Sequence, residues 1–301
     1  MRFWVGIGFI SVIGLGIPRA GAAVLTSARV TEIRNDVRYQ PADAAERAAQ
    51  ISDQVRETDV LRTGERSLAE LEFNDKTITR LGSLSVFSFN RETREFRAGK
   101  GTMLICVPKG VGGGRIVTSA ITAAIQGTTV VVQESLVTVT NSRPRVLSTV
   151  IFLEGSGVVY RTGDASKTGL PIGAGQIISQ FADTPGLAQV RRVDLQVLLK
   201  HARIIHGFNA TLPSLPIIQT VVNQQQADLQ QGNLQHGGGG NPPALPPTPS
   251  SLQVFDTPQQ SQQFRPVIYS VGDGFYLSTL PIPGYNSAPL EGGGYICRPK
   301  H

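Results

Sequence analysis

Apolar and polar residues alternate with a period of two, in short runs, over much of the chain. In the clearest run Leu71 and Phe73 alternate with Glu70 and Glu72, which is typical of a strand with one buried face. An Asn-Asp pair interrupts the run, and the alternation resumes over residues 77–81. Two such runs joined by a tight turn predict a β-hairpin, with both glutamates on the face that water solvates.

The pattern continues as short, β-branched runs separated by glycine, proline and other turn-forming residues. Strands of this length and spacing predict an all-β fold, either an antiparallel β-sandwich or a barrel-like β-domain. The further predicted strands include residues 85–89, 95–97, 103–107, 115–119, 130–132, 137–139, 150–153, 158–160 and 176–181.

The segment Asp59-Val60-Leu61-Arg62-Thr63-Gly64, with the hairpin that follows it, resembles the central motif of FecR-type periplasmic domains. Residues 116–133 resemble the segment of that family that ends in a preferred Gly-Thr, and "VIFLEGSGVVY" and "LPIGAGQIIS" resemble its closing strands. The order of segments agrees, so the resemblance implies a FecR-like β-domain over residues 55–181. The matching positions, called here the motif residues, are Asp59, Arg62, Thr63, Gly64, Leu71, Phe73, Asp75, Gly82, Gly127, Thr128, Gly155 and Gly175.

The chain also departs from the family pattern. Asp75-Lys76 stands where the family commonly has Asp-Gly in the hairpin turn, and Gln126 stands where it commonly has arginine before Gly-Thr. The founding members are transmembrane regulators with a cytoplasmic anti-sigma segment before the membrane span, whereas two residues precede the apolar run here. The resemblance therefore implies a secreted form that lacks this segment.

The first 22 residues read as a secretory signal peptide. Arg2 provides the positive start, residues 3–17 are mostly apolar, and Ala20-Gly21-Ala22 is a small-residue cleavage site. The apolar run falls short of the roughly 20 residues of a membrane-spanning helix, although an uncleaved anchor is the alternative. We expect export to the periplasm or cell envelope of a Gram-negative-type bacterium, or secretion, with no transmembrane span after cleavage.

The mature chain is modestly basic. Its formal charge of +6 falls to +4 when Arg2 and Arg19 are removed. In the full sequence 22 of the basic residues are arginine and 6 are lysine, and they are scattered along it. This distribution favours an anionic partner such as a polysaccharide over a dedicated nucleic-acid surface.

Residues 184–207 follow the pattern of an amphipathic helix that begins at a Thr-Pro pair and ends at a glycine. Valines and leucines share one side, and the opposite arc includes Arg192, Lys200 and Arg203. The helix is expected to pack on the β-domain with this arc in water. A partner-facing or membrane-facing arc is the alternative.

The remaining segments are predicted to contribute little to the fold. Residues 23–54 form an N-terminal segment, residues 208–250 a linker rich in glutamine, glycine and proline, and residues 251–301 a mostly irregular tail. The folded unit is then residues 55–207, and the chain after it is expected to be dispensable for stability.

No catalytic or cofactor-binding constellation stands out in the sequence. The run "GVGGGR" lacks the lysine of a phosphate-binding loop and leads into a predicted strand, so it indicates a hairpin turn. His201 and His206 are five residues apart, one more than the spacing that stacks two ligands on a helix face. We expect no enzyme activity, no metal site and no cofactor.

Two cysteines lie far apart in the sequence, at Cys106 and Cys297. Either Cys106 is buried and unpaired, or a single disulfide bond ties the tail to the β-domain in an oxidising compartment.

These features predict a non-catalytic cell-envelope protein whose β-domain binds a protein or a polysaccharide. The alternative is a periplasmic signalling component related to the FecR-type regulators of sigma factors in metal uptake. The oligomeric state stays open.

Overall fold

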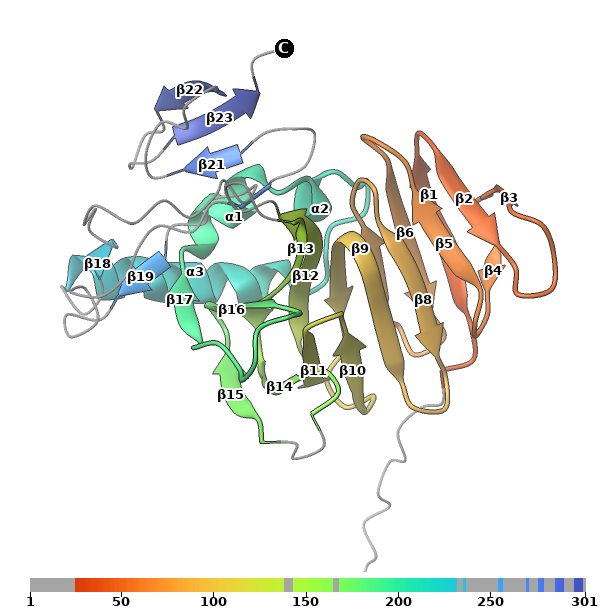
Figure 1. Ribbon diagram of the computed structural model, residues 1–301, viewed down its shortest axis with the longest axis horizontal. Helices are drawn as coiled ribbons and strands as arrows, with labels where there is room; N and C mark the ends of the chain where they lie inside the picture. Colours follow the sequence, from red (N-terminus) through yellow and green to blue (C-terminus); the bar gives the residue numbers. More distant parts are fainter. Residues whose placement is uncertain are drawn as a thin grey trace, which may run out of the picture.

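The computed structural model describes residues 25–137, 143–164 and 168–231, and the backbone of short strands beyond them. Two β-sheets pack face to face, and helices cover the outer side of one of them (Figure 1). The all-β prediction is confirmed in the form of a sandwich. All described strand pairs are antiparallel except β9 with β10.

Sheet A is the one that the helices cover. Its neighbouring strands pair in the order β4, β1, β6, β7, β9, β12, β13, β16, β17, β19 and β18. Their bounds are Gln54–Val55 (β4), Ala28–Arg34 (β1), Leu68–Phe73 (β6), Ile78–Leu81 (β7), Glu95–Cys106 (β9), Thr129–Val137 (β12), Arg145–Glu154 (β13), Gln176–Phe181 (β16), Arg191–Val193 (β17), Val254–Asp256 (β19) and Gln235–His236 (β18).

Sheet B lies against sheet A, and the long strand β9 belongs to both sheets. Its strands pair in the order β3, β2, β5, β8, β9, β10, β11, β14 and β15. The bounds of the strands not yet given are Arg47–Ala48 (β3), Val37–Gln40 (β2), Val60–Thr63 (β5), Val86–Asn90 (β8), Gly113–Val117 (β10), Ile121–Gln126 (β11), Ser156–Arg161 (β14) and Leu170–Gly173 (β15).

Four strands of the C-terminal fifty residues form a separate small sheet. The tail that was predicted to be mostly irregular therefore contains regular strands. Their bounds are Tyr269–Ser270 (β20), Tyr276–Ser278 (β21), Tyr285–Pro289 (β22) and Tyr295–Pro299 (β23).

The chain passes repeatedly from one sheet to the other, and motif residues stand at these corners. Gly64 lies between β5 and β6, Gly82 between β7 and β8, and Gly127 between β11 and β12. Gly155 and Gly175 occupy the two corners that follow, with φ of +76° and +72°. In the turn at Gly64 the left-handed residue is not the glycine but Arg66, with φ of +53°.

We predict that Gly127→Val destabilises the fold. Gly127 has a φ of +58°, and a Cβ there would lie 2.9 Å from Lys109 Cγ and 3.2 Å from Lys109 Cα. A β-branched residue in this region costs about 1–3 kcal/mol before any crowding is counted. Gly110→Val is the matched control, since Gly110 also has a positive φ but a Cβ there would have no other atom within 4 Å. A melting temperature for Gly127→Val no lower than that of the control would contradict the predicted clash.

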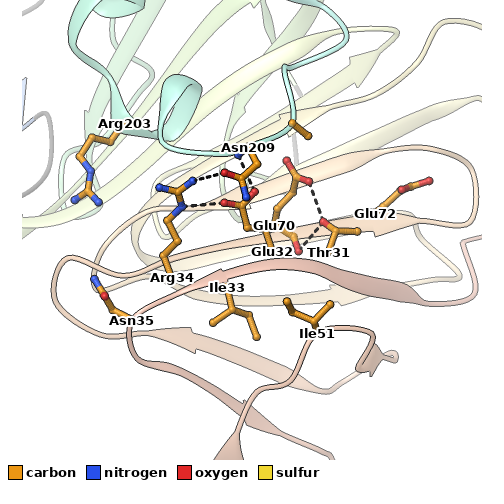
Figure 2. A pocket seen from close by; sticks show the side chains of 11 residues that line it. Thr31, Glu32, Ile33, Arg34, Asn35, Ile51, Glu70, Glu72, Arg203 and Asn209 are labelled. Carbon is orange, nitrogen blue, oxygen red and sulfur yellow. Dashed lines mark hydrogen bonds and ion pairs between the residues drawn. The ribbon is translucent and has the colours of Figure 1, made fainter.

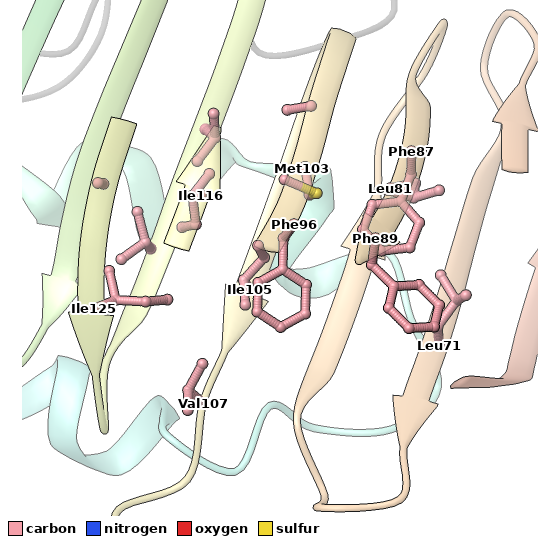
Figure 3. Packing of buried hydrophobic residues seen from close by; sticks show 14 of the residues in the cluster. Leu71, Leu81, Phe87, Phe89, Phe96, Met103, Ile105, Val107, Ile116 and Ile125 are labelled. Atoms are coloured by element: carbon pink, nitrogen blue, oxygen red, sulfur yellow. The ribbon is translucent and has the colours of Figure 1, made fainter. Parts of the chain in front are cut away.

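The main core fills the space between the two sheets (Figure 3). Phe73 contacts Phe89 and Phe96 edge-on, with ring centroids 5.0 Å and 5.4 Å apart. Leu71 is fully buried in the same cluster. The predicted alternation of β6 is therefore confirmed on its inner side, where Leu71 and Phe73 face sheet B.

A second core lies between the outer face of sheet A and three helices. Leu104, Val131 and Ile151 on the sheet side meet Ile204 and Ile218 on the helix side. The helices are α1 (Leu195–His201), α2 (Arg203–His206) and α3 (Leu215–Gln230). None of the described helices is long and apolar enough to cross a membrane.

The prediction of one amphipathic helix over residues 184–207 is wrong. Residues 191–193 form β17 between β16 and β19 of sheet A, and Asp194 then starts α1 by accepting a hydrogen bond from the Gln196 backbone N–H at 2.8 Å. The expected end at Gly207 is correct, since this residue is the C-cap of α2. The helical spacing of the valines was misleading because a short strand of sheet A buries Val193 equally well.

The predicted boundaries of the folded unit are also wrong at both ends. In the N-terminal segment, β1 pairs with β6 and β2 pairs with β5, so the β-domain begins before residue 55. In the predicted linker, α3 buries Ile218 and Val222 in the second core. The structure therefore extends the folded unit from β1 to α3.

Candidate interaction surfaces and buried polar clusters

Glu70 and Arg80 form a buried ion pair on the outer face of sheet A. The register of β6 and β7 places the two residues opposite each other, with Arg80 Nε 2.8 Å from Glu70 Oε2. The Arg80 side chain is fully buried, and that of Glu70 is 7% exposed. The expectation that Glu70 points to water is therefore wrong. Glu72, two residues further on, is 27% exposed and pairs with Lys76.

Arg80 fixes the chain that follows α2. Its two terminal nitrogens donate hydrogen bonds to the carbonyl oxygens of Ile205, at 2.7 Å, and of Ala210, at 2.5 Å. Its guanidinium also lies over the ring of Phe208, 4.4 Å from the centroid. We call residues 205–210 the strap, because they cross the outer face of sheet A at this point. The ion pair thus joins the central hairpin to the C-terminal part of the fold.

Beside the strap lies an open groove of about 920 Å³, shown in Figure 2. Glu32 accepts hydrogen bonds from the Asn209 backbone N–H, at 2.9 Å, and from Arg34 Nε, at 2.8 Å. Arg34 also donates to the Asn209 side chain, and Thr31 donates to Glu70. These polar groups bind one another across the edge of the strap, so their observed contacts hold the strap in place.

A second polar cluster lies under the N-terminal end of α3. Thr129 Oγ1 is 3.0 Å from Glu154 Oε1 and 2.7 Å from Ser214 Oγ, and Cys106 Sγ is 3.6 Å from the same Ser214 oxygen. Oε2 of Glu154 is buried with no hydrogen-bond partner among the described residues. Burial raises the pKa of Glu154, while the hydrogen bond from Thr129 and the charge of Lys109 oppose that shift.

We predict that Glu154→Gln makes the fold less sensitive to rising pH. The raised pKa means that the folded state holds the Glu154 proton more tightly than the unfolded state does. The protonated Glu154 therefore contributes its full stability to the fold below the ordinary pKa of 4.5. This contribution declines as the pH rises through the higher pKa of the folded state. Glutamine carries no charge to bury. The melting temperature of the variant relative to wild type should therefore increase with pH from about 4.5 upwards.

Glu134→Gln is the matched control for that measurement. Glu134 is also buried, but its two oxygens accept hydrogen bonds from the Ser119 backbone and hydroxyl and from the Ser148 hydroxyl, at 2.6–3.1 Å. Replacing this acceptor should destabilise the protein. A pH-independent difference between Glu154→Gln and wild type would show that Glu154 does not carry the pH dependence.

The motif residues with polar side chains mostly hold the sheet-to-sheet corners. Asp59 accepts hydrogen bonds from Tyr39 Oη at 2.6 Å and from the Arg56 backbone at 2.7 Å. Thr63 Oγ1 donates to the Gly82 carbonyl and accepts from the Ser85 backbone, which joins two corners. These contacts give the residues a structural role.

Of three other polar motif residues, two are bonded within turns and one is exposed at the surface. Asp75 pairs with Arg94 at 2.7 Å, inside the hairpin turn, and Thr128 donates to the Gln126 and Ser156 carbonyls. Arg62 differs, since 43% of its side chain is exposed on the outer face of sheet B. Among the polar motif residues described here, Arg62 is the most exposed, since Asp59, Thr63, Asp75 and Thr128 are buried.

The predicted basic arc does not exist as one surface. Arg192 lies in β17 and pairs with Asp228 of α3 at 3.8 Å. Lys200 is exposed on α1, and Arg203 lies in α2 beside the groove. The three residues belong to three different elements because the helix that would have aligned them is broken at residues 194 and 202.

Cys106 is a free, buried cysteine in this structure. Of the two alternatives, the structure thus has the unpaired thiol. Cys297 belongs to β23, and its side chain lies outside the described part of the chain.

The part of the chain that the structure describes has no cluster of three or more histidine, cysteine or carboxylate side chains able to hold a metal ion. His201 on α1 is half-buried. Its burial, and to a smaller extent the positive charge of Lys200, lowers the pKa of its ring. His206 is exposed, with a ring nitrogen against the Leu199 carbonyl oxygen.

The outer face of sheet B, called here the sheet B face, differs from that of sheet A. The three described helices pack on sheet A and leave this face open (Figure 1). Along its strands, five basic residues point outwards and alternate with core residues that point inwards. They are Arg38, Arg62, Arg97, Lys100 and Arg115, and the four arginine side chains are 43–58% exposed.

Carboxylates accompany these cations. Arg38 pairs with Asp36 at 2.8 Å and Arg62 with Glu46 at 3.4 Å, and both acids are themselves more than 40% exposed. Glu95, which is 11% exposed, lies beside the other two arginines. Five cations and three carboxylates leave this face with a net charge of +2. Exposed ion pairs of this kind are weak, typically about 0–1 kcal/mol, so the guanidiniums can exchange partners.

Comparison with known proteins finds distant structural likeness alone. No family model matches the chain, and no curated protein matches it. Two crystal structures of a "putative anti-sigma factor" from Parabacteroides distasonis are similar to it at 12% sequence identity, with TM-scores of 0.37 and 0.36. Each match covers 60% of this chain. It covers 95% of the first crystal structure's chain and 94% of the second's. Likeness at this level assigns no function to the chain.

Proposed function

We propose that this protein is a non-catalytic, exported component of the bacterial cell envelope whose β-domain binds a partner through the sheet B face. The observation that carries the proposal is the contrast between the two outer faces. Apolar residues of sheet A are covered by the protein's own helices and strap. The sheet B face instead presents cations that the core does not require.

The polar clusters support a binding role over catalysis. Glu70, Arg80 and Asp59 are buried and bonded to parts of the fold that they hold together. A reacting group has to reach its substrate, which these three side chains cannot do while buried. Export is supported by the N-terminal residues, which have the order of a secretory signal peptide but lie outside the described residues.

Affinity capture from an envelope extract tests the proposal. The bait is the mature chain from residue 23, compared with a face variant, Arg38→Gln/Arg62→Gln/Lys100→Gln. The control variant, Arg29→Gln/Arg66→Gln/Lys200→Gln, removes the same number of arginines and lysines from exposed positions outside the sheet B face. The proposal expects a partner that the wild type and the control retain and the face variant loses. Equal capture by all three proteins would overturn it.

A signalling component related to FecR-type sigma-factor regulators is the second candidate. It is favoured by the motif residues over residues 55–181. A captured outer-membrane receptor or sigma-regulator protein would favour this role.

A further inference from the structure

Three positively charged residues of the sheet B face stand in one row across the strands. Arg38 is directly opposite Arg62, Arg62 is opposite Val86, and Val86 is opposite Lys100. Neighbouring strands are about 4.8 Å apart. The strand positions of the cations are therefore separated by about 5 Å and then by about 10 Å, along a line perpendicular to the strands.

Such a row is unfavourable for the isolated fold. Like charges directly opposite each other on adjacent strands destabilise a sheet. Asp36 and Glu46 relieve the repulsion between Arg38 and Arg62 through exposed ion pairs, while the core lies on the other side of the strands. The row is easier to understand as a surface that an external anion completes.

The face continues beyond the row in a way that suits a sugar polymer. In the next row, Arg97 is followed by Val117, Thr122 and Tyr160 on successive strands. The last three are partly exposed, and they present methyl groups, a hydroxyl and an aromatic ring side by side. A sugar ring offers C–H groups on its faces and hydroxyl groups at its edge, so it can pack against such a strip while its charged substituents reach the arginines.

We propose that the sheet B face binds a linear anionic polysaccharide, with carboxylates of successive sugars on the row formed by Arg38, Arg62 and Lys100. This inference rests on the proposed function and names the class of its partner. A regular polymer matches cations set at multiples of the strand spacing. A protein interface would instead be expected to centre on a desolvated apolar patch. Here the strip of Val117, Thr122 and Tyr160 lies beside the cations and not at the centre of the face.

Binding should be electrostatic and sensitive to salt, because the participating side chains are exposed. The test uses polygalacturonate as the probe and measures its binding to the full mature chain at low and high salt. Dextran, a neutral polysaccharide, and polyglutamate, an acidic polypeptide, are measured in parallel. We expect polygalacturonate to bind at low salt more tightly than the other two, and high salt to weaken it.

The two triple variants described above locate the site. The face variant should bind polygalacturonate about tenfold more weakly, as expected for three exposed charge pairs, and the control variant should match the wild type. Equal weakening in both variants would show binding through net charge and overturn the assignment. Tighter binding of polyglutamate would overturn the choice of a polysaccharide.

The outcomes for the partner and for the proposed function can be separated. If polygalacturonate fails to bind while capture finds a protein that the face variant loses, the inference fails and the proposed function stands. If polygalacturonate fails to bind and capture finds no partner that depends on the face, both fail.

Discussion

Truncation after Gly207 is expected to unfold the β-domain or to lower its melting temperature sharply. The deletion removes Leu212, Ile218 and Val222, which are at most 3% exposed. Fully burying a side chain of this kind contributes about 1.5–3 kcal/mol, so their loss approaches the whole stability of a typical domain, about 5–15 kcal/mol. It also exposes the part of the apolar outer face of sheet A that α3 covers, while α1 and α2 remain. Thermal unfolding under reducing conditions measures the effect.

Truncation after Gln231 is the matched control. It keeps α3 and the strap. Of the described strand pairings between the removed residues and the rest of the fold, it breaks that of β17 with β19, which consists of two residue pairs. Its melting temperature should stay close to that of the full chain. If both truncations have the same stability as the full chain, α3 does not belong to the folded unit.

The sandwich could be predicted because its inner faces leave a clear mark on the sequence. In β6, each residue that points to the inner core is followed by one that does not, so Leu71 and Phe73 identify the strand and its buried side. The corners were visible for a similar reason, since Gly127, Gly155 and Gly175 take left-handed conformations that favour glycine.

A helix was expected to pack on the β-domain, but it was not predicted that the outer face of sheet A is the covered one, although the sequence contains a signal for it. Residues 103–107, 130–132 and 150–153 are continuous apolar runs, as expected of strands buried on both faces. Alternation within β6 could not reveal what covers Glu70, because the strap that meets Arg80 is 125 residues further along the chain. In β1 the period is broken by an irregularity between Val30 and Glu32, which hid that strand.

From the sequence, the charge of a partner could be predicted for the interaction surface, but not the residues that form this surface. The excess of arginine favoured an anionic partner, but Arg38, Arg62 and Lys100 are far apart in the sequence. Strand register brings them into one row, and register depends on pairings between distant segments. The basic arc failed for the same reason, since Arg192 and Lys200 were placed together by a helix that does not form.

Arg80→Leu is expected to be among the most destabilising single substitutions. It leaves Glu70 as an uncompensated buried carboxylate, and removing one partner of a buried ion pair typically costs about 3–5 kcal/mol. It also leaves the carbonyl oxygens of Ile205 and Ala210 without the donors that hold the strap. Chemical denaturation measures the loss of unfolding free energy, and hydrogen exchange in residues 205–210 should increase with it.

Lys76→Gln is the control for this experiment, because the Lys76–Glu72 pair lies in the same hairpin but the lysine side chain is 77% exposed. Its effect should not exceed about 1 kcal/mol. The double variant Glu70→Leu/Arg80→Leu removes both buried charges and should recover part of the stability lost in Arg80→Leu. If Arg80→Leu costs no more than Lys76→Gln, or leaves exchange in the strap unchanged, the ion pair does not anchor the C-terminal part of the fold.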